Sequence, residues 1–186
     1  STARTLGLAH VPEDRHRCGM VLPFAAWETA ELGYQRSPRF ASAWGWMKRA
    51  VMRSATAQMM DAYDVRPRNP ALQASKFSGG NQQKLVLARE ALAPEVPPTV
   101  LLVGQPTRGV DVGAKAEIYE LLRRFTAEGG TILAVSGDLP ELIGLCDRIL
   151  VVRGGAIVAD VPGHSATEEL LLGHALRSES PSKATA

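Results

Sequence analysis

Apolar residues along the chain form two kinds of pattern, short continuous runs and longer stretches in which they recur at helical spacing. The short runs predict strands, and the pair Gly154-Gly155 predicts a hairpin turn between two of them, so strands are expected over 6–11, 100–103, 131–135, 148–152 and 156–159. Helical spacing predicts helices over 41–63, 81–92, 115–128 and 139–145. Because strands and helices alternate, we expect an α/β fold with a mostly parallel sheet.

The helix predicted over 41–63 carries large apolar side chains, among them Trp44, Met47 and Met59. Their spacing places them on one side of a helix, so we expect them to pack in a core. A groove that receives a partner is the alternative for the same pattern.

Composition narrows the class of protein. The chain has 186 residues, 45% of them hydrophobic, which is enough to bury a core. A net charge of +2 is too small to predict nucleic-acid binding, and no apolar run is long enough to span a membrane. Cys18 and Cys146 lie far apart without metal-ligand spacing, which indicates reduced thiols and no metal site. Residues 177–186 are small and polar and are predicted to form a disordered tail.

One short motif has a chemical use at the start of a predicted helix. In Ser78-Gly79-Gly80, two residues without Cβ let backbone N–H groups approach an anion, and the serine hydroxyl adds a donor. The helix N-terminus favours negative charge, so the motif suits a phosphate. Ordinary helix capping is the alternative when the motif is taken alone.

The surroundings of this motif resemble a known family. FSGGNQQKLVLARE (77–90), an apolar strand and QPTRGVDVGA (105–114) resemble the signature, Walker B strand and D-loop of ATP-binding-cassette (ABC) proteins. HVPEDRHRCGMVL (10–22) and CDRILVVRGGAIV (146–158) resemble the second cassette of tandem-cassette importers for simple sugars and nucleosides. The resemblance implies a P-loop NTPase (RecA-like) sheet with an inserted helical subdomain. The core would comprise 1–24 and 77–176, and the subdomain 25–76.

By this resemblance, ATP and Mg²⁺ are the expected cofactors, and the signature residues expected at ATP are Ser78, Gly79, Gly80, Asn81, Gln82 and Gln83. Glu13 falls in the Q-loop and Asp111 in the D-loop, which crosses to a partner cassette. The helical subdomain would dock integral membrane permease subunits. Packing inside the subdomain is the first expectation for Trp27 and Trp46, and contact with those subunits is the alternative. The expected location is the cytoplasmic face of the cell membrane, as a peripheral protein.

Several positions depart from the family pattern. The Walker A motif G-x-x-x-x-G-K-[ST] is absent, and we expect a chain truncated after it. Gly104 and Gln105 stand where the Walker B strand ends in Asp-Glu, and Gly137 stands at the switch-histidine position. No catalytic residue is therefore intact, because Gln can hold a water but cannot act as a base. Asp138 or Asp111 as a substitute base is the alternative.

The resemblance and the departures together predict a cassette that supplies its signature residues to an ATP site, the rest of which belongs to a partner cassette. The full-length protein would be a transport ATPase, and the isolated fragment is expected to be inactive. The form of residues 105–109 favours nucleosides slightly over pentoses or hexoses. A soluble ABC-type ATPase without a membrane partner and a non-catalytic regulatory nucleotide-binding module are the alternative functions.

Overall fold

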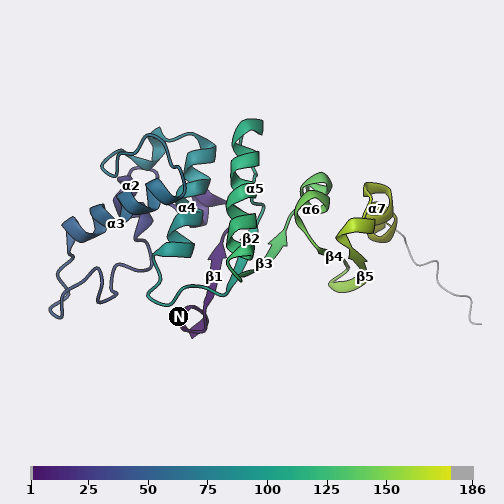
Figure 1. The fold of residues 1–186 in the computed structure, drawn as a ribbon, viewed down its shortest axis with the longest axis horizontal. Helices are drawn as coiled ribbons and strands as arrows, with labels where there is room; N and C mark the ends of the chain where they lie inside the picture. The colour runs from purple at the N-terminus through teal and green to yellow at the C-terminus, as the bar shows by residue number, and fades with distance from the viewer. Residues whose placement is uncertain (1, 177–186) are drawn as a thin grey trace, which may run out of the picture. The chain divides into compact units, whose positions relative to one another are not determined.

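A computed structural model describes residues 2–176, with the side chains of Thr2 and Thr5 left aside (Figure 1). The tail predicted over 177–186 lies outside the described residues. The chain divides into two compact units, Ser1–Val135 and Ser136–Ala186. Residues 25–76 fall wholly within the first unit, and their assignment to a helical subdomain stays a prediction.

The first unit is built on a three-stranded parallel sheet. Its strands lie in the order β1-β2-β3, with bounds β1 (Leu8–Val11), β2 (Val100–Gly104) and β3 (Thr131–Val135). Leu8 pairs with Val100, which in turn pairs with Thr131. Alternation along β1 and β2 buries Ala9, Val11, Leu101 and Val103. The sequence prediction of a parallel α/β sheet is confirmed.

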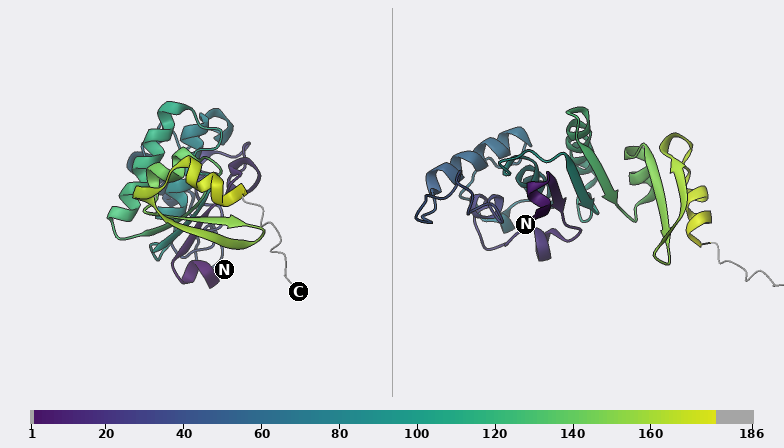
Figure 2. Two further views of the ribbon diagram at one scale, coloured as in Figure 1. Left: turned by 90° about the vertical axis from the view of Figure 1, so that its right-hand side faces the viewer. Right: turned by 90° about the horizontal axis from the view of Figure 1, so that it is seen from below.

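Helices cover this sheet and form a cluster beside it (Figures 1 and 2). Helix α4 packs against β1, α5 packs against β3, and α2, α3 and α4 pack on one another. Their bounds, with the short helical turns η1 and η2, are α1 (Thr2–Thr5), η1 (Arg15–Gly19), α2 (Ala26–Ala30), α3 (Arg49–Ala62), η2 (Ala74–Lys76), α4 (Gly79–Leu92) and α5 (Val112–Ala127). Helix α4 is the centre of the core, because every residue from Gln82 to Glu90 is buried.

The second unit contains its own small core. It comprises α6 (Leu139–Leu145), β4 (Arg148–Arg153), β5 (Ala156–Pro162), η3 (Gly163–Ser165) and α7 (Glu168–Leu176). Gly154 and Gly155 have φ of 58° and 81°, the conformation that a two-residue hairpin turn requires, so the predicted hairpin is confirmed. The hairpin and α7 enclose an apolar cluster of Ile149, Val151, Val161, Ala166 and Leu171.

The helix predicted over 41–63 is wrong in its first third. The structure begins α3 at Arg49, and residues 40–48 instead form a small hairpin, in which Ala41 and Met47 form an antiparallel bridge. Trp44 is 89% exposed, so the expected core packing of this residue is also wrong. Helical spacing of apolar residues misled the prediction because it was counted across a glycine, Gly45, whose φ of 80° no helix contains.

Two strands also differ from expectation. The strand over 148–152 was expected as one more member of a parallel-type sheet, but within residues 2–176 β4 pairs with β5 alone, in antiparallel orientation. The strand over 131–135 forms as β3, but its continuous apolar run is not buried throughout, because Leu133 and Val135 are 53% and 64% exposed. The local apolar pattern predicted where the strands lie, whereas their pairing depends on residues that are distant in the sequence.

Candidate functional site

The predicted signature residues lie at the start of α4, where Ser78 caps the helix. The Ser78 hydroxyl accepts hydrogen bonds from Asn81 through the backbone N–H, at 3.4 Å, and through the side-chain amide, at 2.9 Å. Phe77 is buried directly before the cap and fixes the entry of the chain, while Ser78 itself is exposed. The proton of this hydroxyl is used in neither bond, so it is available to an incoming anion.

The two signature glycines are required by close packing within the chain. A Cβ on Gly79 would lie 2.6 Å from the carbonyl oxygen of Gly109, and one on Gly80 would lie 2.4 Å from Cβ of Ala114. Both distances are far below normal contact, so no side chain fits. The loop after β2 and the start of α5 therefore lie directly against the start of α4.

Arg15, in the segment after β1, ties these pieces together. Its guanidinium donates to the carbonyl oxygens of Arg108, at 2.6 Å, and Gly109, at 3.0 Å. Its Nε donates to Gln82 Oε1 at 3.3 Å, and His16 Nε2 donates to the same oxygen at 2.8 Å. Partial burial lowers the pKa of Arg15, against the opposing effect of the Asp14 charge. The guanidinium thus links the segment after β1, helix α4 and the loop after β2.

Asp14 shapes the turn that presents Arg15. Its carboxylate accepts from the backbone N–H groups of His16 and Arg17, both at 3.0 Å. The hydrogen bond from Arg17 lowers the pKa of Asp14, against a smaller opposing effect of desolvation. Sequence reasoning singled out Glu13 and missed Arg15 and His16, although the whole stretch 10–22 carried the resemblance.

The end of β2 holds the positions at which the family pattern is lost. A Cβ on Gly104 would lie 2.9 Å from the backbone nitrogen of Glu13, so the backbone of Glu13 occupies the space of a side chain. Gln105 adopts φ of 48°, and its N–H donates to the Val135 carbonyl at 2.7 Å. Glu13 therefore lies beside Gly104, and Gln105 lies in a turn that continues the pairing of β2 with β3.

The two aspartates considered as substitute bases both begin helices. Asp111 caps α5 by accepting from the Ala114 N–H at 2.9 Å, and Asp138 caps α6 by accepting from the Glu141 N–H at 3.2 Å. Asp138 and Gly137 lie in the second unit, and Asp111 lies in the first. Capping gives each carboxylate a structural role at its own helix start.

The later signature residues point into the protein. Gln82 and Gln83 are 6% and 2% exposed, and the Gln82 amide also donates to the Ala74 carbonyl at 3.1 Å. Further along α4, the buried Lys84 ammonium lies 2.8 Å from Glu117 Oε2. Of the six predicted signature residues, the exposed or half-buried ones are Ser78, Gly79 and Asn81.

These residues fit a phosphate better than a metal ion. The N-terminus of α4, with the free proton of Ser78, suits an anion. Gly104 and Gln105 supply no carboxylate, and the Asp111 carboxylate already caps a helix. Within residues 2–176, no group of three or more His, Cys, Asp or Glu side chains is placed to hold a metal ion. In the same part of the chain, no helix combines the length and apolar character of a membrane span.

Curated relatives are similar over nearly the whole chain. The chain is 44% identical over 170 residues to the xylose import ATP-binding protein XylG of Burkholderia ambifaria, which covers 91% of the chain and 32% of that relative. It is 40% identical over 172 residues to the ribose import ATP-binding protein RbsA 2 of Streptomyces avermitilis, covering 92% of the chain and 33% of the relative. The chain thus spans about a third of the length of these relatives. No family model matches it.

Solved structures share the fold at low sequence identity. A dimeric ATP-binding cassette bound to ADP and Pi aligns with a TM-score of 0.64 and 22% identity, over 83% of this chain and 62% of the other. A nucleotide-free ATP-binding cassette from an ABC transporter aligns with a TM-score of 0.69 and 16% identity, over 87% and 63%. The chain therefore has the fold of ABC ATPase domains, and its homologues are the ATP-binding proteins of sugar importers.

Proposed function

We propose that this chain is part of the ATPase of an ABC importer and supplies Ser78, Gly79 and Gly80 to an ATP site that a partner cassette completes. The observation that carries the proposal is the contrast between two adjacent segments. The start of α4 keeps an exposed hydroxyl with a free proton. The end of β2, held beside it through Arg15, offers only Gly104 and Gln105.

In the proposed site, Ser78 and the N-terminus of α4 bind the terminal phosphates of an ATP held by the partner. The Ser78 hydroxyl, held by Asn81, donates to a phosphate oxygen. The helix N-terminus stabilises the negative charge, and Arg15 fixes its position against the loop after β2. ATP supplies the energy of transport, and Mg²⁺ would be held by the partner's residues.

The site built on this chain's own degenerate positions is proposed to be hydrolytically dead. The Gln105 amide cannot accept a proton from water, and the loss of a general base alone costs about 10²- to 10⁴-fold in rate. If Gly104 were the Asp that orients a metal ion in the family, its Cβ would lie 2.9 Å from the backbone nitrogen of Glu13, which is too close. The packing around position 104 therefore favours glycine over that Asp.

The names of the relatives support a sugar as the transported solute. Those quoted above are named for xylose and ribose import, so we propose a pentose or related simple sugar, with nucleosides as the alternative. Permease subunits would bind the helical cluster, and the assembly would lie at the cytoplasmic face of the membrane. The dimeric cassette among the solved structures supports a partner cassette, whether in the same or another polypeptide.

The test uses the full-length protein reconstituted with its permease. Ser78→Arg places a bulky cation at the start of α4 and should abolish ATP hydrolysis, whereas Gln105→Ala should change the rate by less than about twofold. Ser75→Arg, at an exposed serine in the neighbouring turn η2, is the matched control for Ser78→Arg. Equal loss from Ser78→Arg and Gln105→Ala would disprove the asymmetric site. Co-purification with a permease distinguishes an importer from a soluble ABC-type ATPase.

A further inference from the structure

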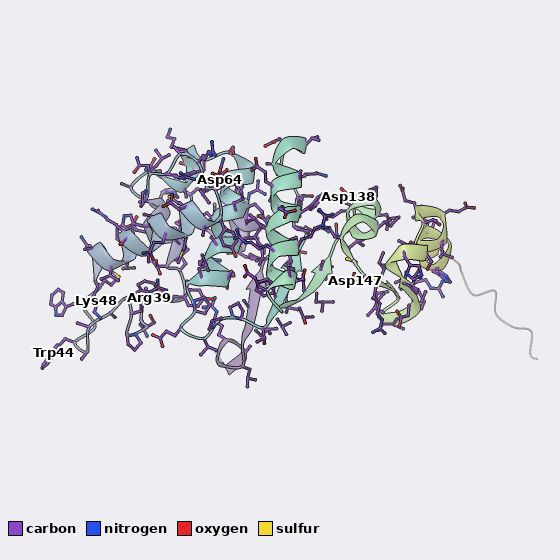
Figure 3. The ribbon with its side chains drawn as sticks, viewed as in Figure 1. Arg39, Trp44, Lys48, Asp64, Asp138 and Asp147 are labelled. Atoms are coloured by element: carbon purple, nitrogen blue, oxygen red, sulfur yellow. The ribbon has the colours of Figure 1, made fainter. Side chains whose placement is uncertain are left out.

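The hairpin over 40–48 is an ordered projection of the first unit (Figure 3). Beyond the Ala41–Met47 bridge, the Lys48 N–H donates to the Phe40 carbonyl at 2.8 Å, which closes the base of the hairpin. Phe40 is fully buried and anchors the hairpin to the unit. The base of the hairpin is therefore attached to the unit by backbone hydrogen bonding and by a buried aromatic ring.

Two indole rings are carried at the tip of this hairpin. Ser42 holds Trp46 twice, by donating its N–H to the Trp46 carbonyl at 2.9 Å and by accepting the Trp46 N–H on its hydroxyl at 3.1 Å. Gly45, with φ of 80°, turns the chain between the two rings. Trp44 is 89% exposed, Trp46 78% and Met47 50%. Figure 3 shows Trp44 pointing outward at the extremity of the unit.

The segment around the tip is exclusively cationic. Residues 32–60 contain no Asp or Glu, and their charged side chains are Arg36, Arg39, Lys48, Arg49 and Arg53. All five are exposed, and none forms an ion pair with a described residue. Lys48 and Arg39 donate to the neutral carbonyls of Pro38 and Leu92, so these hydrogen bonds do not neutralise their charge.

Exposed indole rings above a cationic base are the features that bind the headgroup region of a lipid bilayer. Tryptophan partitions to the membrane interface because its ring is apolar and its N–H can remain hydrated. Basic side chains near the rings are attracted by anionic lipid. We infer that residues 36–53 bind an anionic bilayer surface, with Trp44 and Trp46 in the interface and the cations at the level of the lipid phosphates.

A second copy of the chain is a poorer occupant of this surface. Two copies related by a twofold axis would bring five cations against five cations with no carboxylate of the segment between them. Lipid phosphates supply the opposite charge over a wide, deformable surface. The inference extends the peripheral location in the proposed function, and it requires neither nucleotide nor a partner cassette.

The test measures binding of the 186-residue chain to vesicles by flotation and tryptophan fluorescence. One set of vesicles is phosphatidylcholine alone, and the other contains about 40% phosphatidylglycerol. We expect the chain to float with the anionic vesicles, with a blue shift of the tryptophan emission, and to be released by high salt. The third tryptophan, Trp27, is 7% exposed and provides a constant background.

Two variants separate the contributions of the rings and the charges. Trp44→Ser/Trp46→Ser should lower the partition coefficient at least about 10-fold. Arg36→Gln/Arg49→Gln should lower it on the order of 10-fold for anionic vesicles only. The matched controls are Val112→Ser, at an 85% exposed apolar residue, and Arg17→Gln/Lys76→Gln, which should leave binding unchanged. Circular dichroism checks that every variant keeps the fold.

Four results would overturn the inference. These are failure to bind anionic vesicles, equal losses in the control variants, tryptophan-dependent self-association without vesicle binding, and binding only to vesicles that contain the permease. The last two would assign the surface to a second copy or to a protein. Loss of the asymmetric ATP site with vesicle binding intact would disprove the proposed function and leave this inference standing.

Discussion

Helix α4 and the end of α2 both bury ionisable side chains, but those in α4 form ion pairs and the one after α2 does not. In α4, Lys84 lies 2.8 Å from Glu117, and Arg89 lies 2.8 Å from Glu90. After α2, Glu31 is 0% exposed, and neither of its carboxylate oxygens has a hydrogen-bond partner among the described residues. One helix carries its buried charges in pairs, whereas the other ends on a solitary acid.

The difference decides which protonation state each region holds. Burial raises the pKa of Glu31 to about 7, although the Arg39 charge opposes the shift. In α4, by contrast, Arg89 also donates to the Thr29 carbonyl at 3.4 Å, in addition to its ion pair with Glu90. Helix α4 thus holds its buried charges in ion pairs, while burial after α2 favours the neutral form of Glu31.

Breaking the pair at Arg89 should have the largest effect. Arg89→Met leaves Glu90, itself 1% exposed, with only the Tyr34 hydroxyl at 2.9 Å and the more distant Arg4 guanidinium at 3.7 Å, and should lower the free energy of unfolding by about 3 kcal/mol. Urea unfolding measures the loss. The double variant Arg89→Met/Glu90→Gln should recover part of it, because the buried carboxylate charge is gone. A loss below about 1 kcal/mol in the single variant would remove the distinction between the two helices.

Replacing either member of the second ion pair, Lys84 and Glu117, should show which of the two charges depends more on the other. Glu117→Ala leaves the buried Lys84 ammonium with the neutral Asp64 carbonyl but without its carboxylate partner, and should cost about 2–3 kcal/mol. Lys84→Met should cost less, because the Glu117 side chain is 55% exposed and regains water. Thermal unfolding of the two variants gives the order. The reverse order would show that packing of the Lys84 stem outweighs its charge.

Neutralising Glu31 should stabilise the protein by a smaller amount. The folded pKa of about 7 lies above the ordinary value of 4.5, so the folded state keeps a proton that the unfolded state releases. The contribution of Glu31 to the free energy of unfolding is therefore greatest below pH 4.5, falls as the pH rises to about 7, and stays low above it. Glu31→Gln should add about 2 kcal/mol at pH 8 and almost nothing near pH 4.

The control for this effect is Glu95→Gln, at an exposed carboxylate. It should change the free energy of unfolding by less than about 0.5 kcal/mol at either pH. Equal stability of Glu31→Gln and the parent chain at pH 8 would mean that the Glu31 carboxylate is solvated, and the contrast with α4 would fail.

Much of the fold could be predicted from local pattern. The run over 100–103 is apolar throughout and became β2, and the spacing over 81–92 became α4 with its start moved to Gly79. The hairpin over 40–48 could not be predicted in this way, because its tryptophans also satisfy helical spacing. What decides between the two is a buried anchor, Phe40, whose burial no local pattern reveals.

In the candidate site, too, local features could be predicted from the sequence, whereas contacts between distant residues could not. Ser78 at the start of a helix is visible in the sequence, and the structure places it as the N-cap. The contact of Gly80 with Ala114 and the approach of Glu13 to Gly104 join residues far apart in the chain. The role of Arg15 was missed for the same reason, since its partners come from two other segments.

The bonds of Arg15 also bear on how the site comes into being during folding. They join residues separated by 67 positions, to Gln82, and by 94 positions, to Gly109. Contacts across such separations close large loops and form slowly, after local helices have appeared. Helix α4 can therefore form before the hydrogen bonds of Arg15 fix its position against the loop after β2. In a nascent chain, we expect the complete set of these bonds only after Gly109 has been synthesised.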